Sequence, residues 1–165
     1  MLAGVLLAMG QAQAGEADAG VGKKLAAQDL KYEVDEDGDY KLLFGLDDDR
    51  SQIVWVRSPV ETLGGMRIRE VLAIGGKLPK SKGADAAGMQ ATLTRDAMLK
   101  SSDQKLGGWV LKTSDDERVF YYVAQIPADL NAADLETVAR VVAQNGDEFE
   151  KVVESMTDPD EKDTY

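Results

Sequence analysis

The sequence predicts an α+β domain in which an antiparallel β-sheet is flanked by helices, in the order α-β-β-β(-β)-α-β-β-α. Three observations support this class: alternating apolar and polar runs separated by turns, an apolar stripe at helical spacing near the C-terminus, and a globular composition. The chain has 165 residues, of which 44% are apolar and 30% are charged. These values suit one folded domain with its own core.

The first half of the chain predicts a short helix followed by strands. Residues 21–30 can form the helix, with apolar side chains along one side. Apolar residues then alternate on both sides of Asp37-Gly38, which predicts a hairpin over residues 31–46 with a type I′ turn. Residues 52–57 are rich in β-branched and aromatic side chains and predict a third strand. Residues 66–74 fit a strand or a helical turn, and we adopt the strand.

The second half predicts a loop, a helix, a second hairpin and a long helix. Residues 75–88 are rich in Gly, Lys and Ala and predict a loop, the best candidate for local mobility. Residues 89–99 predict a helix, and residues 106–112 and 118–126 predict the two strands of a hairpin.

The last helix is predicted by an apolar stripe from Leu135 to Met156, with Asn131 as its cap. We expect a kink or a break at Asn145-Gly146, because Gly weakens a helix interior. We therefore expect a single domain over residues 21–156, a flexible leader over residues 15–20, and an acidic disordered tail over residues 157–165.

The N-terminal segment has the form of an export signal. Residues 2–9 are almost all apolar, and Ala12-Gln13-Ala14 follows them, as at a signal-peptide cleavage site. The apolar run is too short to span a bilayer. No Lys or Arg precedes it, so either the true start lies upstream or the segment is an Ala-rich tail. We expect residues 1–14 to be a signal peptide and the protein to be periplasmic.

The composition excludes several kinds of chemistry. The chain contains no Cys and no His, which removes thiolate and imidazole metal ligands and the usual nucleophile–base pairs. Its net charge of −11 repels nucleic acid and anionic lipid, and it favours solubility or a partner with a basic surface. We expect no enzymatic activity, no cofactor, no nucleic-acid partner and no membrane insertion.

Two acidic segments are candidate cation sites as well as candidate turns. The segment Asp35–Asp39 lacks the spacing of an EF-hand, which needs Gly at position six and Glu at position twelve. The run Asp47-Asp48-Asp49 can hold a hard cation weakly or form a solvated turn. A binder of a small ligand or cation through these acidic loops is the alternative function that the sequence leaves open.

Five aromatic residues form a candidate interaction surface, namely Trp55, Trp109, Phe120, Tyr121 and Tyr122. Because neighbouring side chains on a strand face opposite sides, one layer of helices cannot bury both Tyr121 and the pair Phe120 and Tyr122. One sheet face therefore exposes aromatic surface, unless helices or a dimer cover both faces. An exposed apolar patch on an acidic monomer usually marks an interface.

Several short segments resemble the YbjN-like family of bacterial sensory transduction regulators, which has the type III secretion chaperone-like fold. The segments that carry the resemblance are Tyr32–Asp39, Gln52–Ser58, Leu106–Trp109 and Ala139–Val153. The likeness covers about residues 21–155. It implies a helix-flanked antiparallel sheet that engages protein partners and often dimerises, with no catalytic residues to carry over. Secretion chaperones and much of this family are cytoplasmic, from which the signal-like N-terminus departs.

These observations predict a non-enzymatic, periplasmic protein-interaction module. We expect an unidentified protein partner, or a second copy of the chain in a homodimer.

Export generates the first testable prediction. When the complete gene is expressed in its host, the mature protein should begin at Gly15, because the Ala-x-Ala motif ends at Ala14. The intact mass of the protein from an osmotic-shock fraction measures this. An uncleaved chain found only in the cytosol contradicts the prediction.

Overall fold

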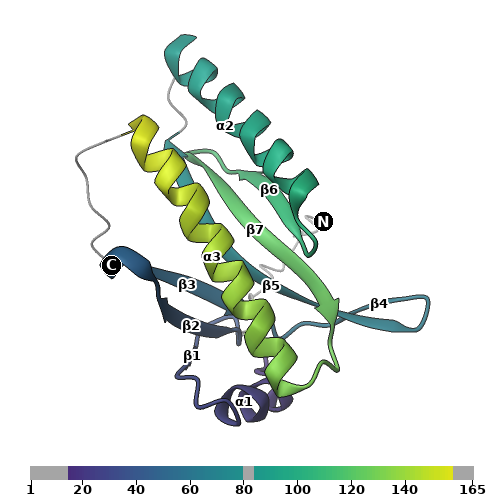
Figure 1. Ribbon diagram of the computed structural model, residues 1–165. Helices are drawn as coiled ribbons and strands as arrows, with labels where there is room; N and C mark the ends of the chain where they lie inside the picture. Colours follow the sequence, from purple (N-terminus) through teal and green to yellow (C-terminus); the bar gives the residue numbers. More distant parts are fainter. Residues whose placement is uncertain (1–14, 80–83, 158–165) are drawn as a thin grey trace, which may run out of the picture.

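The computed structural model describes residues 15–79 and 84–157 (Figure 1). It contains three α-helices, one short 3-10 helix and seven strands. In chain order the elements are α1 (Ala19–Ala26), β1 (Glu33–Val34), β2 (Tyr40–Gly45), η1 (Asp47–Asp49), β3 (Ser51–Val56), β4 (Glu61–Leu63), β5 (Met66–Pro79), α2 (Ala84–Asp103), β6 (Gly108–Thr113), β7 (Glu117–Pro127) and α3 (Ala132–Thr157).

The strands form one antiparallel sheet in the order β1-β2-β3-β5-β7-β6. The strand β4 pairs only with the beginning of β5, and this hairpin projects from the sheet (Figure 1). The predicted class, an antiparallel sheet flanked by helices, is confirmed. The predicted order also matches broadly, with five strands before α2 instead of three or four.

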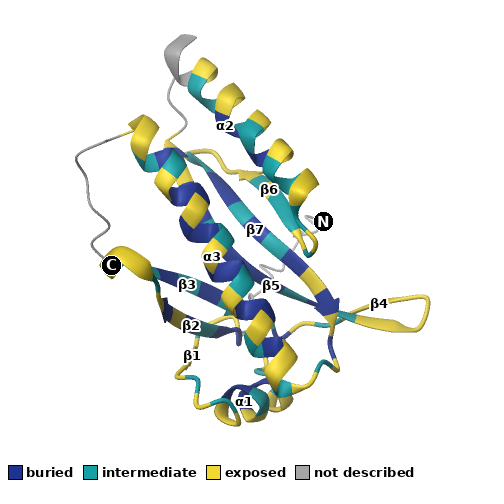
Figure 2. Ribbon diagram, in the orientation of Figure 1, coloured by how far each residue is buried: buried dark blue, intermediate teal, exposed yellow. Residues whose placement is uncertain are grey.

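All three helices pack on the same face of the sheet. Figure 1 shows α3 running diagonally across the strands, with α2 beside β6 and α1 below β1 and β2. Two apolar clusters lie beneath them. The larger joins α1 and α3 to β2, β3, β5 and β7. The smaller joins α2 and α3 to β5 and β7 around Phe149. The buried stripe of α3 faces these clusters (Figure 2).

Glycines allow α3 to lie very close to β5. A Cβ on Gly146 of α3 would lie 3.0 Å from Ala73 Cβ and 2.8 Å from Gln52 Nε2. A Cβ on Gly76 would lie 2.7 Å from Val153, and one on Gly75 would lie 2.4 Å from the Trp109 ring. The register of β5 against β7 shifts between Ile74 and Gly76, at this contact.

The predicted loop over residues 75–88 is wrong on both of its flanks. Residues 75–79 are the end of β5, and α2 begins at Ala84; residues 80–83 lie outside the described residues. The glycines that suggested a loop are packing positions beneath Trp109 and Val153. The sequence also missed β4, which is only three residues long and exposed throughout.

The expected flexible leader is also corrected, because it contains the start of α1. The Asp18 carboxylate caps this helix by accepting a hydrogen bond from the Gly20 N–H at 2.8 Å. The Asp18 N–H donates to Ser58 Oγ at 3.0 Å. Of the remaining terminal predictions, the signal peptide over residues 1–14 and the tail beyond Thr157 lie outside the described residues.

Two local predictions fail for geometric reasons. In the first hairpin only Gly38 has a positive φ, of 80°, whereas a type I′ turn needs two such residues. The Asp35 N–H donates to the Asp39 carbonyl, so three residues form the loop.

In α3 the expected kink is absent, since one helix runs through Asn145 and Gly146. Asn131 caps that helix as predicted, accepting from the Asp134 N–H at 2.9 Å.

The close approach of α3 to β5 generates a prediction with a matched control. Replacing Gly by Ala in a free helix position stabilises it by up to about 1 kcal/mol. We expect that gain for Gly88→Ala on α2, because a Cβ there meets nothing within 4 Å. Gly146→Ala should instead lower the free energy of unfolding by about 1–3 kcal/mol, the usual cost of overpacking a core. Urea unfolding of both variants measures this, and equal stabilisation by the two contradicts it.

Candidate functional site

One face of the sheet carries apolar side chains outside the two helix-covered clusters. Residues paired across antiparallel strands share a face. The register places Trp55, Leu72 and Val123 in one row and Ile74, Tyr121 and Val110 in the next, with Leu43 opposite Ile53. None of these residues belongs to either cluster beneath the helices. We call these eight residues the open face: Leu43, Ile53, Trp55, Leu72, Ile74, Val110, Tyr121 and Val123.

The open face is most accessible at its two ends. Leu43 is 66% exposed and Val110 is 41% exposed. Between them, Trp55, Ile74 and Tyr121 are half-buried, and Leu72 is buried. The patch crosses β2, β3, β5, β7 and β6, and a patch of this kind is typical of a protein-interaction surface.

The five predicted surface aromatics divide between the two faces. Trp55 and Tyr121 belong to the open face. The other three are corrected: Trp109, Phe120 and Tyr122 lie under the helices. Phe120 and Tyr122 are fully buried, and the Trp109 ring lies 4.3 Å from the Phe149 ring and 5.3 Å from the Tyr122 ring between centroids. The alternation argument correctly separated Tyr121 from its two neighbours.

Two small hollows meet at the centre of the open face. One, of about 160 Å³, lies between Trp55, Leu72 and Tyr121 and extends to the Asp35–Asp39 turn. The other, of about 190 Å³, lies where β3 and β5 diverge, and it is bordered by Ile53, Lys77 and Glu150. Trp55 and Ile74 line both hollows. An apolar side chain of a partner could therefore seat on either side of Trp55.

The charged residues on this face nearly balance one another. By strand alternation, continued by one residue beyond β2 and β3, the face carries four basic residues (Lys41, Arg57, Lys77 and Lys112) and five acidic residues (Glu33, Asp39, Glu61, Glu70 and Glu117). The net charge of the face is thus −1 on a chain of net charge −11. Lys112 Nζ lies 5.2 Å from the centre of the Tyr121 ring. The acidic excess behind the expectation of a basic partner therefore lies mostly elsewhere on the chain.

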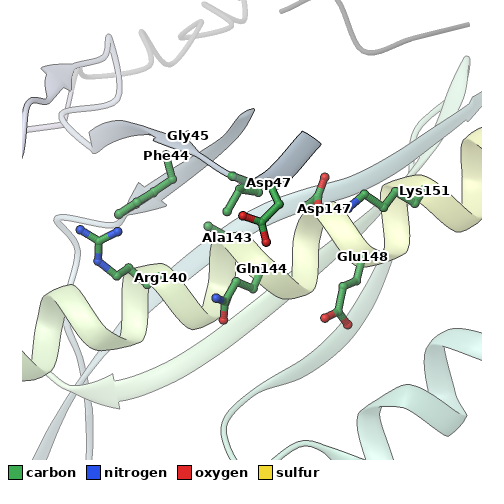
Figure 3. Close-up of a pocket in the computed structure, with 10 residues that line it drawn as sticks. Phe44, Gly45, Asp47, Arg140, Ala143, Gln144, Asp147, Glu148 and Lys151 are labelled. Carbon is green, nitrogen blue, oxygen red and sulfur yellow. Dashed lines mark ion pairs between the residues drawn. The ribbon is translucent and has the colours of Figure 1, made fainter. Parts of the chain in front are cut away.

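A larger pocket lies on the helix side of the sheet, between the end of β2 and α3 (Figure 3). Its volume is about 500 Å³. We call it the helix-side pocket, and it is lined by Phe44, Gly45, Leu46, Asp47, Arg140, Ala143, Gln144, Asp147, Glu148 and Lys151. Figure 3 shows Arg140 pointing toward Phe44, whose ring centre lies 5.3 Å from the guanidinium carbon.

The acidic turn lines this pocket together with residues of α3. Asp47 comes from the predicted acidic turn, and Asp147 and Glu148 come from the helix. Asp147 is already engaged, because Lys151 Nζ lies 2.8 Å from its Oδ2. Asp35 is engaged as well, since its Oδ1 accepts from the N–H groups of Asp37 and Asp39 at 3.0 Å each. Within residues 15–79 and 84–157, no group of three or more acidic side chains is arranged to hold a metal ion.

Arg50 connects the turn after β2 to α3 through three carboxylates. Its guanidinium pairs with Asp147, with Glu154 at 3.0 Å and with Glu150 at 3.3 Å. Burial disfavours the charge on Arg50, but the hydrogen bonds to Glu154 and Asp147 raise its pKa above the ordinary value. No local pattern predicts this cluster, because Arg50 lies about 100 residues from its partners.

A second ionic cluster fixes α1 to the sheet. Arg69 is buried and donates to the Asp18 carboxylate and to the carbonyls of Arg57 and Ser58. Burial opposes ionisation of Asp18, yet hydrogen bonds from the Gly20 N–H and Arg69 hold its pKa below the usual value. Burial raises the pKa of Asp39, although the Ser58 N–H and Arg57 favour its carboxylate. Both clusters hold elements together, and each also borders a hollow: Asp147 lines the helix-side pocket, and Asp39 and Arg57 line the hollow beside Trp55.

Comparison with known proteins adds no relative to this description. No protein-family model matches the chain, and no curated protein is significantly similar to it. Among the described helices, none is both long enough and apolar enough to cross a membrane.

The Arg50 cluster generates a stability prediction. Arg50→Met should lower the free energy of unfolding at pH 7 by about 3–5 kcal/mol, because it removes the cation held among three carboxylates. The deficit should shrink as the pH falls toward 4, since protonation removes the repulsion between those carboxylates. Arg140→Met is the control, with a loss of at most about 1 kcal/mol, because that side chain is half-exposed. Urea unfolding across pH measures both, and a pH-independent deficit contradicts the explanation.

Proposed function

We propose that this protein is a non-enzymatic protein-interaction module that binds a protein partner through the open face. The observation that carries this proposal is the apolar patch across five strands, which lies on the face opposite to all three helices. A domain that needed this face only for its own stability would cover it with a helix or a second sheet.

The chemistry of the face indicates the kind of partner. Trp55 and Tyr121 are large aromatic anchors beside hollows, and such residues contribute most of the binding free energy at many interfaces. Lys77 and Lys112 lie in the next row, on both sides of Val119. The partner that fits presents apolar side chains to the hollows and carboxylates to these two lysines.

The remaining features are consistent with this role. The absence of His and Cys supports a binding function over catalysis. The apolar N-terminal segment supports export to the periplasm. The resemblance to the YbjN-like family supports a regulatory or chaperone-like role, and we include both in the proposal.

A second candidate function is a binder of a small ligand in the helix-side pocket. Its supporting observation is the volume of about 500 Å³, with Asp47 and Glu148 at the rim. A ligand that binds the folded state raises the melting temperature by mass action. A thermal-shift screen of amines, amino acids and divalent cations tests this function, and an Asp47→Asn variant should remove any shift that it finds.

Two adjacent tyrosines provide the test of the main proposal. Tyr121→Lys should leave the melting temperature within about 3 °C of the wild type, because Tyr121 lies on the open face. Tyr122→Lys should unfold the domain, because it places a charge in the fully buried core. Thermal unfolding followed by circular dichroism compares them. If both variants unfold, Tyr121 belongs to the core and the open face loses its central residue.

Association is tested with the same position. A photo-crosslinking amino acid at residue 121 should give a discrete adduct in the native host, and one at the exposed Gln144 on α3 should not. Ile74→Lys should abolish the adduct at residue 121. A discrete adduct at 144 with none at 121 shifts the proposal to the helix side, and sedimentation velocity identifies an adduct that is a homodimer.

A further inference from the structure

The outer edge of β2 is only partly occupied by another strand. Within the described residues, β1 is the one strand on this edge, and it pairs with Tyr40 and Lys41 alone. The chain leaves β2 at Tyr32, whose ring packs edge-on against Tyr40 at 5.0 Å between centroids. From Leu42 to Gly45, β2 has a strand partner only on its inner side, where β3 lies.

The backbone groups of Leu43 and Gly45 point toward this edge. In an antiparallel ladder, alternate residues direct their N–H and C=O groups to opposite sides. The Asp35 N–H donates to the Asp39 carbonyl, so odd-numbered residues of β2 face outward. The Leu46 N–H donates to the Arg50 carbonyl, so even-numbered residues face β3. Two donors and two acceptors are therefore directed outward beyond β1.

The other edge of the sheet is partly covered by a helix. On β6, the N–H of Trp109 donates to Ser101 Oγ of α2 at 2.8 Å. The Ser114 N–H donates to the Glu117 carbonyl, so the odd-numbered residues of β6 face outward, and the backbone groups of Leu111 and Thr113 point to this edge as well. Natural sheets usually cover, shorten or charge their edges, because an open edge pairs with other chains. Helix α2 packs beside β6 (Figure 1), whereas pockets border β2 on both faces of the sheet, so the β2 edge is the better candidate for binding.

Pockets lie on both sides of the open β2 edge. On one side is a notch of about 610 Å³, which we call the edge pocket, lined by Lys31, Tyr32, Glu33, Lys41, Leu42, Leu43 and Ile53. On the other side is the helix-side pocket, which Phe44 and Gly45 border. A Cβ on Gly45 would meet nothing within 4 Å. A strand added here would place alternate side chains into the two pockets.

We propose that the outer edge of β2 is a strand-addition site for an extended segment of the protein partner. The added strand pairs with Leu43 and Gly45, inserts apolar side chains into the edge pocket and directs polar side chains into the helix-side pocket. This inference rests on the proposed function and names the conformation of the partner.

The charges at the edge pocket select an acidic strand. Lys31 and Lys41 line the pocket together with the single acidic residue Glu33, which lies opposite Lys41 across the β1–β2 ladder. A carboxylate on the added strand can therefore pair with Lys31. The mouth of the pocket is apolar, since Leu43 is 66% exposed and Tyr32 is 39% exposed. The segment thus alternates apolar and polar residues and carries a carboxylate at one end.

The experiment uses the chain from Gly15 and a synthetic hexapeptide, Glu-Thr-Val-Thr-Val-Thr, with acetylated and amidated ends. We expect a dissociation constant of about 1 mM or tighter by NMR titration. Bound peptide should slow amide exchange at Leu43 and Gly45 at least about tenfold, because their N–H groups become hydrogen-bonded. Binding weaker than this, or protection elsewhere without these two amides, overturns the proposal.

Leu43→Pro separates the backbone contact from the side chain. Proline removes the outward N–H and no hydrogen bond to β3, so the sheet should keep its fold while affinity falls at least about tenfold. Leu43→Val is the matched control and should keep affinity within about threefold, because it retains the N–H and an apolar side chain. N-methylation of the two valines in the peptide should cause the same loss of affinity. This second test does not alter the protein, so it decides the question even if the proline variant unfolds.

Charge reversal supplies an independent readout. Lys31→Glu should weaken the Glu peptide and strengthen the counterpart peptide that begins with Lys, and equal effects on both peptides contradict the predicted orientation. The crosslinking and peptide-binding results together distinguish failure of the strand-addition proposal from failure of the proposed function. If the adduct at residue 121 forms equally well in Leu43→Pro, the open face is the interaction surface and strand addition is wrong. If the adduct never forms but the peptide binds, the edge site remains and the open-face proposal is wrong.

Discussion

The contact between α3 and β5 is the constraint on which the rest of the structure depends. The two backbones approach closely because small residues line the contact. Gly146 on the helix faces Ala73 on the strand, and Gly75 and Gly76 on the strand face Trp109 and Val153. The register shift beside Gly76 adjusts β5 to the helix, and β3 pairs with β5 only over Val71–Ala73. Arg50 holds the turn before β3 to α3 at this end of the sheet. The aromatic cluster of Trp109, Phe120 and Phe149 fills the space between α3, β6 and β7.

Because α3 binds so closely to one side, the sheet is asymmetric in its chemistry. One face has the helices, the buried aromatic residues and the ionic clusters. The other has an apolar patch whose charges nearly cancel, while the chain as a whole has a charge of −11. The acidic excess is therefore carried by the remaining surface and the terminal segments. Such a distribution favours solubility, and it leaves one surface whose weak net charge repels neither an acidic nor a basic partner strongly.

The sequence predicted the elements whose patterns are local. Alternation identified β2, and β-branched and aromatic content identified β3. Strands were also predicted at β6 and β7, and the stripe from Leu135 identified α3 with its Asn131 cap. Patterns failed where a residue has its role through a distant neighbour. Gly75 and Gly76 were predicted to lie in a loop, because the residues that pack on them, on α3 and β6, are distant in the sequence. Trp109 was predicted to be exposed, but Phe149 of α3 packs against it. A period of two separates Tyr121 from Phe120 and Tyr122, but it does not show which of the two sheet faces the helices cover, so it could not place Tyr121 on the open face. The Arg50 cluster and the open β2 edge depend wholly on tertiary arrangement.

The packing of Gly15 has a consequence for the order of events in the biogenesis of this protein. A Cβ at residue 15 would lie 1.9 Å from the carbonyl oxygen of Asp37, and Ala17 packs against the main core cluster. The folded domain thus contacts the chain from Gly15 onward, although Gly15 and Glu16 are exposed, whereas a peptidase must hold the residues on both sides of its scissile bond in an extended groove. If processing occurs after Ala14, the contact between Gly15 and the first hairpin competes with the peptidase for the same residues, so cleavage is easier before that hairpin forms than after it.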